Sequence, residues 1–429
     1  MHKIKFIDLF AGIGGIRKGF ELACSEKGYE TECVFTSEIK PYAVDILIQN
    51  HPSETVYGDI TKIDAKDIPT FDFLLAGFPC QAFSAAGKRL GFQDTRGTMF
   101  FEVERILADK KPYGFVLENV EGLVNHNKEH PHDKIGKTFK TILEHLDALG
   151  YYVSWKILNA KEFGVPQERK RIYIVGTRKI APSLDKFEPT YSTLSDILES
   201  GLSTSESKFV KQLLSHYSVN ELCGKAIKDK RGGENNIHSW DFDHKGVTSQ
   251  QEKDLLNCMM RERRKKKWAK EFGIDWMDGM PLTIEQIRTF YDVPELEEML
   301  EHLVKLKYVR KEYPKKKVGN RRVQDTSLPI GYNIVAGKMS FEVAKVLDPN
   351  GNAPTLVAMD MQHLFVPDGS GIRQLTLREG LRLFGYPNDY KFDTTIENGY
   401  DLLGNTVAIP VIKAVAGRVL DIYEEEFDI

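Results

Sequence analysis

The chain has 429 residues, a formal net charge of −3 and a hydrophobic fraction of 41%. This length exceeds that of an ordinary single domain and predicts two domains, or one domain with a large insertion. No apolar run reaches the roughly 18 residues of a membrane span, and a strand-like segment close to Met1 argues against a signal peptide. The cysteines have neither the pattern of a disulfide framework nor CxxC metal spacing, since they are scattered at Cys24, Cys33, Cys80, Cys223 and Cys258. We therefore expect a cytoplasmic protein that needs no metal ion and contacts no membrane.

Short strand-like runs alternate with amphipathic helical stretches over residues 1–184. The expected strands include 5–7, 33–37, 71–75, 114–117, 153–158 and 172–175, and the expected helices lie near 15–27, 40–50, 99–111 and 135–149. This alternation predicts an α/β fold with a mostly parallel sheet and helices on both faces. Residues 373–429 again have the pattern of helices that pack on a sheet, so we expect them to complete this first domain.

The region 185–372 has a different sequence pattern, with polar stretches and a basic part. Helices are expected near 248–272, 284–291 and 295–307, followed by a strand at 308–313 and a basic loop at 315–322. The order resembles a winged-helix-like module at 281–322, whose second helix, 295–307, and basic loop we expect to contact DNA, although any small α/β insertion can produce this order. Residues 261–322 contain 17 Lys and Arg against 11 Asp and Glu, which suits a nucleic-acid partner or an ordinary solvated face.

Three strand ends carry residues suited to an adenosine cofactor. The glycine-rich segment 8–15 follows the first strand and opens a helix, where the backbone can approach a ligand closely. Arg17 occupies the position of the third glycine in a dinucleotide fingerprint, which favours a smaller adenosine cofactor. Glu38 and Asp59 end the next two strands, where carboxylates can accept hydrogen bonds from both ribose hydroxyls and from an adenine amino group. Each acid alone is better explained as a surface cap or turn residue, and it is the occurrence of all three features at successive strand ends that favours an adenosyl group.

Other strand ends carry residues suited to chemistry on a base. Pro79 fixes the backbone before Cys80, which places the thiol on a stiff turn at the rim of a sheet; a small apolar core cysteine is the alternative. Glu118 could donate a proton to a ring nitrogen if burial retains that proton, or it could cap a helix. Arg169 and Arg171 alternate onto one side of a strand and suit phosphate or carbonyl oxygens, unless they form a charged strand edge.

Six motifs in this order resemble those of DNA cytosine-5 methyltransferases of the bacterial restriction-modification type. They are DLFAGIGG at 8–15, GFPCQAFS at 77–84, ENV at 118–120, QERKR at 167–171, RQLTLREGLRLFGYP at 373–387 and GNTV at 404–407. The resemblance covers roughly residues 1–180 and 350–420. It implies a class I S-adenosylmethionine-dependent methyltransferase fold, Rossmann-like, with a target-recognition domain inserted at 185–372.

The resemblance also implies a role for individual residues. Cys80 would attack carbon 6 of cytosine, Glu118 would bind and protonate ring nitrogen 3, and Arg169 and Arg171 would orient the flipped base, in a pocket shaped by Asn119. S-adenosylmethionine would be held by Phe10, Gly12, Ile13, Gly15, Glu38, Ile39, Asp59, Ile60, Pro79, Asn405 and Thr406. The expected DNA contacts are Gln81, Ser84, Arg96, Thr355 and Leu356, and from the basic loop Lys315, Lys316 and Lys317. Ile39 stands where many members carry an aromatic residue.

The implied reaction is the transfer of a methyl group to carbon 5 of a cytosine flipped out of duplex DNA, through a covalent adduct with Cys80. We expect a monomer that acts separately from a cognate restriction endonuclease. One alternative is a tRNA cytosine-5 methyltransferase on the same fold, which would be shorter between 180 and 350. The other is a catalytically idle DNA-binding repressor, against which the intact Cys80 and Glu118 argue.

Overall fold

The computed structural model describes residues 3–79, 99–130, 132–230, 233–274, 279–319, 321–335, 341–358 and 360–427. The chain forms two compact units. The first contains Met1–Glu199, Pro349–Gln362 and Leu375–Ile429, and the second contains Ser200–Asp348 and His363–Gln374. Compared with the expected division, residues 185–199 and 349–362 belong to the first unit, and residues 373–374 belong to the second.

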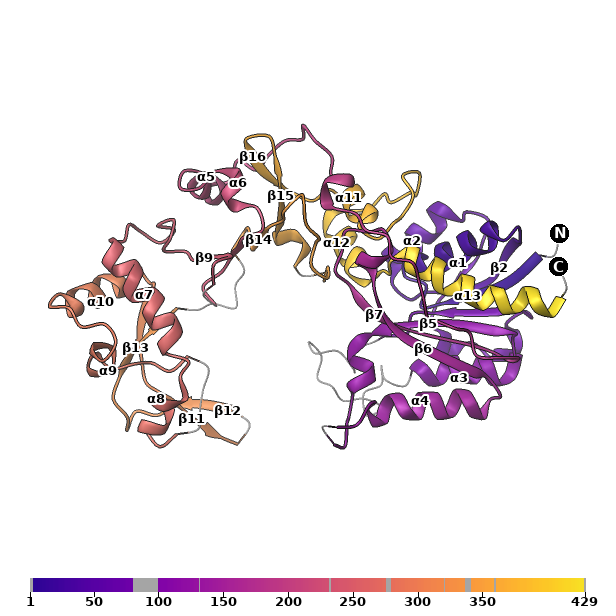
Figure 1. Cartoon of the computed structure of the whole chain (residues 1–429), viewed down its shortest axis with the longest axis horizontal. Helices are drawn as coiled ribbons and strands as arrows, with labels where there is room; N and C mark the ends of the chain where they lie inside the picture. The colour runs from indigo at the N-terminus through magenta and orange to yellow at the C-terminus, as the bar shows by residue number, and fades with distance from the viewer. Residues whose placement is uncertain are drawn as a thin grey trace. The chain divides into compact units, whose positions relative to one another are not determined.

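The first unit is built on a seven-stranded sheet of order β3-β2-β1-β4-β5-β7-β6 (Figure 1). Strands β1 to β5 pair in parallel, while β7 runs antiparallel to both β5 and β6. The predicted mostly parallel sheet is therefore confirmed. The strands are β1 (Lys3–Leu9), β2 (Glu30–Ser37), β3 (Val56–Tyr57), β4 (Phe73–Ala76), β5 (Gly114–Val120), β6 (Tyr152–Asn159) and β7 (Lys170–Thr177).

Helices cover both faces of this sheet, as Figure 1 shows. Helices α3 (Met99–Lys110) and α4 (Lys137–Ala148) pack on one face, and α1 (Gly15–Glu26) and α13 (Ile409–Phe427) pack on the other. Each helix presents apolar side chains at three- and four-residue spacing, as Ile16, Phe20 and Ala23 do in α1, which buries one stripe against the strands. The remaining helices of the unit are α2 (Pro41–Asn50), α11 (Leu377–Arg382) and α12 (Ile396–Asn405).

Helix α13 completes the first unit from the far end of the chain. Among the described residues, the stretch 396–424, which includes α12 and most of α13, is long and apolar enough to cross a membrane by length and composition alone. Its most apolar window is 67% buried inside the protein, and Val411, Val415 and Val419 join the core cluster with α1. The apolar composition of α13 is therefore explained by its place in the core.

The carboxyl ends of the central strands meet at one edge of the sheet. The register pairs Leu9 of β1 with Ser37 of β2 and with Ala76 of β4, and Ala76 with Leu117 of β5. The segments that follow these residues must emerge side by side, at the edge where open α/β sheets bind ligands. This register is the reason that motifs far apart in the sequence form one site.

The second unit contains a five-stranded sheet and a helical part, each with its own core. The sheet has the order β16-β15-β14-β8-β9, with β8 (Ala226–Ile227), β9 (Asn236–Ile237), β14 (Lys345–Val346), β15 (Leu364–Asp368) and β16 (Gly371–Gln374). The helices α5 (Lys208–Leu214) and α6 (Val219–Leu222) belong to the same part of the unit.

The helical part begins with α7 (Gln250–Glu262) and α8 (Lys266–Glu271), so the single helix expected near 248–272 is broken. Arg263 ends α7, and Trp268 of α8 folds back to donate its indole N–H to the Glu262 carbonyl at 2.8 Å. Next come α9 (Ile284–Arg288), α10 (Leu296–Lys305) and strand β10 (Val309–Glu312), which pairs with β13 (Gly331–Ile334). The expected basic loop is a hairpin of β11 (Lys315–Val318) and β12 (Arg321–Gln324).

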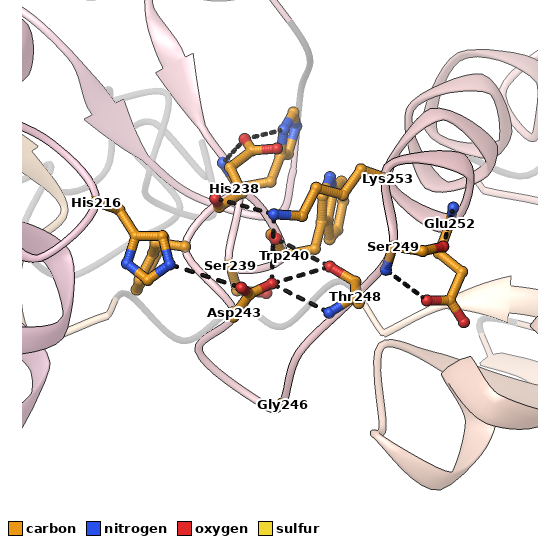
Figure 2. A network of polar contacts seen from close by, with 12 residues as sticks. His216, His238, Ser239, Trp240, Asp243, Gly246, Thr248, Ser249, Glu252 and Lys253 are labelled. Carbon is orange, nitrogen blue, oxygen red and sulfur yellow. Dashed lines mark hydrogen bonds and ion pairs between the residues drawn. The ribbon is translucent and has the colours of Figure 1, made fainter.

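A polar network around Asp243 fixes the chain between α5 and α7 (Figure 2). The Asp243 carboxylate accepts hydrogen bonds from the Thr248 backbone N–H at 3.2 Å and hydroxyl at 3.0 Å, and lies 3.3 Å from Lys253 Nζ and 3.6 Å from His216 Nε2. Burial opposes ionisation of Asp243, but the Thr248 bonds and Lys253 outweigh it and lower the pKa of Asp243. The network therefore joins the segment after α5 to the first turns of α7.

Candidate functional site

The loop after β1 has a constrained backbone. Phe10 has a φ of 55° and Gly12 a φ of 56°, a left-handed conformation that is rare for a bulky residue such as Phe10 and typical of functional sites. A Cβ atom added at Gly12 would meet no atom of the described residues within 4 Å. Glycine is therefore required here by the backbone conformation, and the space above it is open to a ligand.

Glu38 holds this loop. Its Oε2 accepts a hydrogen bond from the Gly12 N–H at 2.7 Å, and its Oε1 accepts from the N–H groups of Ile39 at 2.9 Å and Lys40 at 2.8 Å. A carboxylate offers about four acceptor positions, so Glu38 retains capacity for about one further donor. The sequence predicted an acid that holds both ribose hydroxyls, and the structure shows that the same carboxylate also accepts from three backbone N–H groups.

The ends of β2 and β3 supply a carboxylate and an aromatic surface. Asp59 caps the short helix 60–62 by accepting from Thr61 N at 3.1 Å and Thr61 Oγ1 at 2.7 Å, and these bonds lower its pKa. The ring of Tyr57 stacks on that of Phe35 with 4.4 Å between centroids. Ile39 is 72% exposed and Ile60 is buried. An exposed isoleucine, a carboxylate and an aromatic ring are suited to an adenosyl group, although the cap function of Asp59 also stands.

Residues of the C-terminal segment pack against the loop that follows β1. A Cβ atom at Gly15 would lie 2.7 Å from Tyr386 Oη and 2.9 Å from Thr406 Oγ1, so only glycine allows this close approach. The Thr406 hydroxyl is buried and lies 2.6 Å from Tyr386 Oη. Asn405 is exposed and donates its side-chain N–H to the Asp401 carbonyl at 2.7 Å. Ile13 is buried, and its carbonyl accepts from Tyr390 Oη at 2.5 Å.

Glu118 and Arg171 form a largely buried pair at the end of β5. Arg171 Nε lies 3.2 Å from Glu118 Oε1, with side-chain exposures of 14% and 11%. Burial raises the pKa of Glu118 above its ordinary value and outweighs the opposite effects of Arg171 and Arg169. Glu118 therefore retains its proton to a higher pH than an exposed glutamate, as a proton donor to a base requires.

Arg169 has partners that the sequence did not indicate. Its guanidinium donates to the carbonyl oxygens of Leu356 at 3.1 Å, Gly404 at 3.4 Å and Thr406 at 2.7 Å, and it lies over the ring of Phe384. The side chain is buried. It thus joins the start of β7 to the segments before and after α12, which is a positioning function.

The pair Thr355 and Leu356 was expected to contact DNA, and the structure places it against the same arginine segment. The Thr355 hydroxyl donates to the Glu168 carbonyl at 2.7 Å. The Leu356 side chain is fully buried, with a relative exposure of 0%. The expected DNA contact through the Leu356 side chain is therefore not supported, because no part of that side chain reaches the surface.

The turn before Cys80 is anchored to β5. Asn119 donates its side-chain N–H to the Phe78 carbonyl at 3.1 Å, and Gly77 lies beside Glu118, since a Cβ atom there would be 3.8 Å from Glu118 Oε2. Pro79 ends the described part of this turn. The other residues predicted for this segment, Cys80, Gln81, Ser84 and Arg96, lie outside the described residues.

The C-5 cytosine-specific DNA methylase family matches residues 4–421 of this chain. The chain belongs to that family. It is similar to the Type II methyltransferases M.NlaIV of Neisseria lactamica and M.NgoBV of Neisseria gonorrhoeae, with 63% and 62% identity over 421 residues that cover 98% of this chain and 99% of each relative. Among solved structures, the methyltransferase EhMeth of Entamoeba histolytica has a TM-score of 0.53 at 16% identity and covers 99% of both chains; at that identity the likeness concerns the fold alone.

These comparisons confirm the predicted family, its methyltransferase fold and methylation of DNA cytosine at carbon 5 as the activity. Use of S-adenosylmethionine follows from membership of this family. The open space at Gly12, the remaining acceptor capacity of Glu38 and the exposed Ile39 fit the adenosyl part of that cofactor. In the described ranges no group of three or more His, Cys, Asp or Glu side chains could hold a metal ion.

Two buried charged residues of this methylase were not predicted as site residues. Arg17 pairs with Glu21 at 2.7 Å and Glu54 at 2.5 Å, which joins α1 to the segment after α2. Neither oxygen of Asp8 has a hydrogen-bond partner among the described residues. Burial raises the pKa of Asp8 to about 8, against the lowering effect of Arg17. Asp8 therefore retains its proton to a higher pH than an exposed aspartate, which sequence inspection alone could not indicate.

Asp401 joins two parts of the candidate cofactor site of the methylase. Its Oδ2 lies 2.6 Å from both Lys40 Nζ and Tyr42 Oη, and its Oδ1 lies 3.3 Å from Asn405 Nδ2. One carboxylate thereby links the segment after Glu38 to the end of α12. The signal available in the sequence was an acid one helical turn before Asn405, the i, i+4 spacing of neighbours on a helix.

Replacing Asp401 with asparagine is expected to weaken S-adenosylmethionine binding by about 3- to 10-fold, because the linking hydrogen bonds lose their charged acceptor. Isothermal titration calorimetry with S-adenosylmethionine and S-adenosylhomocysteine measures this effect. Asp389→Asn, at an exposed position between α11 and α12, is the matched control and should leave both affinities unchanged. Equal affinities of wild type and Asp401→Asn would show that the link does not support the cofactor site.

Proposed function

We propose that this methylase acts through a covalent adduct between Cys80 and carbon 6 of a cytosine flipped out of duplex DNA, with Glu118 as the proton donor. The observation that carries the proposal is the position of Glu118, whose raised pKa accompanies a place beside Gly77 and the turn that leads to Cys80. A protonated carboxyl there can donate to ring nitrogen 3, while an ionised one would repel the lone pair of that atom.

Cys80, Glu118 and Arg171 have separate roles in the proposed methyl transfer. The Cys80 thiolate forms a bond to carbon 6, and Glu118 transfers its proton to ring nitrogen 3, so that electron density moves to carbon 5. S-adenosylmethionine supplies the methyl group that carbon 5 takes. Carbon 5 then loses its proton to solvent, and the freed electron pair forms the carbon 5–carbon 6 double bond as the Cys80 thiolate leaves carbon 6. Nitrogen 3 returns its proton to the Glu118 carboxylate, which restores both protein groups. Arg171 holds the Glu118 carboxyl in place throughout.

The cofactor is proposed to bind at the carboxyl edge of β1 to β3. Glu38 would accept from a ribose hydroxyl, Asp59 would accept from the adenine amino group, and Ile39 and Ile60 would contact the ring. Phe10, Gly12, Ile13 and Gly15 would shape the loop, and Pro79, Asn405 and Thr406 would bound the methionine side. The open space over Gly12 and the free acceptor capacity of Glu38 support this assignment.

We further infer that the chain is the modification enzyme of a restriction-modification system and acts as a monomer, separately from its endonuclease. The similarity to Type II methyltransferases over 98% of the chain supports this assignment. The family match and the Type II relatives argue against both alternatives, a tRNA methyltransferase on the same fold and an idle repressor, and the presence of Cys80 and Glu118 argues further against the repressor.

Bisulfite sequencing of genomic DNA and of tRNA, both from cells that express the chain, tests the substrate. Methylcytosine at one short DNA sequence, with unmethylated tRNA, is the expected result. Cells that express Cys80→Ser provide the control for background methylation. New methylation confined to tRNA would contradict the proposed substrate.

DNA contact is proposed for the hairpin rather than for α10. The buried stripe of α10 is formed by Leu296, Met299, Leu300 and Leu303, as its sequence predicts. Its exposed positions, however, include Glu297, Glu298 and Glu301, which would repel phosphates. Lys315, Lys316 and Lys317 follow on the hairpin and carry the opposite charge.

Replacing Lys315, Lys316 and Lys317 with alanine is expected to flatten the dependence of DNA affinity on salt. Each phosphate contact that is lost lowers the slope of log K against log salt by about one, because fewer counterions are released on binding. Fluorescence anisotropy with a labelled duplex at several salt concentrations measures the slope. An unchanged slope would exclude these lysines from the phosphate contacts.

A further inference from the structure

The hairpin β11–β12 is an exposed two-stranded ribbon. All of its strand residues are exposed except Lys315, which is half-buried. Its base is closed by a hydrogen bond from the Asp325 N–H to the Pro314 carbonyl at 2.8 Å, and Asp325 also pairs with Lys316 at 3.1 Å. An isolated ribbon with neither face buried is only marginally stable in water, and the exposure of its strand residues leaves both faces accessible to a partner.

The register gives the ribbon two different faces. Residues directly opposite each other in an antiparallel pair lie on the same face, and the next pair lies on the other. The pairs Lys315 with Gln324 and Lys317 with Arg322 define one face, here called the polar face. The pairs Lys316 with Val323 and Val318 with Arg321 define the other, here called the valine face.

The polar face has a charge arrangement that favours an electron-rich partner. Lys317 and Arg322 stand directly opposite each other on this face, and Lys315 pairs with Glu312 at 3.8 Å at the base of the hairpin. The sequence 315–324 contains five Lys and Arg and no Asp or Glu. Phosphate oxygens and base acceptor atoms are the groups that a cationic face of this kind binds. On the valine face, Val318 and Val323 are 55% and 42% exposed and offer no hydrogen bonds to a base edge.

We propose that the polar face of the hairpin enters the major groove and that Arg322 and Gln324 are specificity-determining residues, with Lys315 and Lys317 on the flanking phosphates. The inference rests on the proposed DNA contact of the hairpin and adds which side of the ribbon recognises bases. A two-stranded ribbon fits the major groove, where an arginine pairs with guanine and a glutamine pairs with adenine through two hydrogen bonds each.

Arg321 and Arg322 offer a matched comparison, because they are neighbours of the same type, both exposed and on opposite faces. Wild type, Arg321→Ala, Arg322→Ala and Gln324→Ala would be assayed on a duplex library randomised around the cytosine that the wild type methylates. Bisulfite sequencing of the products gives the base preference at every position, and anisotropy gives the salt slope.

Arg322→Ala and Gln324→Ala are each expected to lose about tenfold discrimination between the preferred base and the other bases at one position of the target sequence. This is the effect of losing one bidentate hydrogen-bond contact. Arg321→Ala should keep the wild-type base preference. Equal changes for Arg321→Ala and Arg322→Ala, a larger change for Arg321→Ala, or no change in any variant would each overturn the assignment of the polar face. With any of these three results the wild type still methylates the library, so the proposed DNA methylation is unaffected. If the wild type methylates no member of the library, both the proposed DNA methylation and the assignment of the polar face are overturned.

Discussion

Replacing Cys80 with serine is expected to abolish methyl transfer, with a loss of about 10⁴-fold or more in rate. A serine hydroxyl is a far weaker nucleophile than a thiolate, and without addition to carbon 6 the carbon 5 atom of cytosine stays unreactive. Transfer of a labelled methyl group to duplex DNA measures the rate. Binding of S-adenosylmethionine should be nearly unchanged, because its proposed contacts come from other strand ends.

The covalent adduct offers a second measurement of the same step. DNA that carries 5-fluorocytosine at the target should trap wild type as a stable complex, since fluorine cannot leave carbon 5 as a proton does, whereas Cys80→Ser should form none. Cys258→Ser, in helix α7 of the second unit, is the matched control and should retain both activity and trapping. Turnover by Cys80→Ser, or the absence of an adduct with wild type, would exclude the proposed mechanism.

The strands and helices of the first unit were predictable because their sequence patterns are local. The apolar run at Phe73–Ala76 is a strand buried on both faces, and the spacing of Ile16, Phe20 and Ala23 is helical. The antiparallel direction of β7 was not predictable, because strand direction depends on pairing with β5 and β6. The alignment of strand ends that creates the site depends on the same long-range register.

The site residues follow the same division. Glu38, Glu118 and Arg171 could be chosen from their positions at strand ends. The fixed positions of Arg169 and Leu356 could not, because their hydrogen bond joins backbone and side-chain atoms from distant parts of the chain. The pairing of Asp401 with Lys40 is equally remote in sequence. Spacing along the chain gives no information about such partners, so burial of Leu356 came as a correction.

The acidic surface of α10, in contrast, could have been predicted. Glu297, Glu298 and Glu301 occupy the helix positions outside the apolar stripe, and their charge is visible in the sequence. The expectation that this helix contacts DNA gave more weight to the general order of a winged helix than to the charge of its exposed face. Charge on the exposed face should decide between two candidate elements for a phosphate contact.

Replacing Glu118 with glutamine is expected to slow the chemical step by about 10²- to 10⁴-fold, with little change in DNA affinity. The amide can still donate a hydrogen bond to ring nitrogen 3, but it has no acidic proton to transfer there. Single-turnover methylation with enzyme in excess measures the step without product release. Glu121→Gln, at an exposed position just after β5, is the matched control and should keep the wild-type rate.

The pH dependence separates a proton donor from a structural carboxyl. Because burial raises the pKa of Glu118, the protonated form persists above the usual range of a glutamate and is lost as the pH rises through the raised pKa. Ionisation of Cys80 changes the single-turnover rates of wild type and Glu118→Gln in the same way. The wild-type rate divided by the Glu118→Gln rate therefore reports only on the protonation of Glu118. This ratio should therefore fall with rising pH. A ratio that is constant with pH, or a Glu118→Gln variant that loses DNA binding while its single-turnover rate is unchanged, would show that Glu118 only supports the pocket.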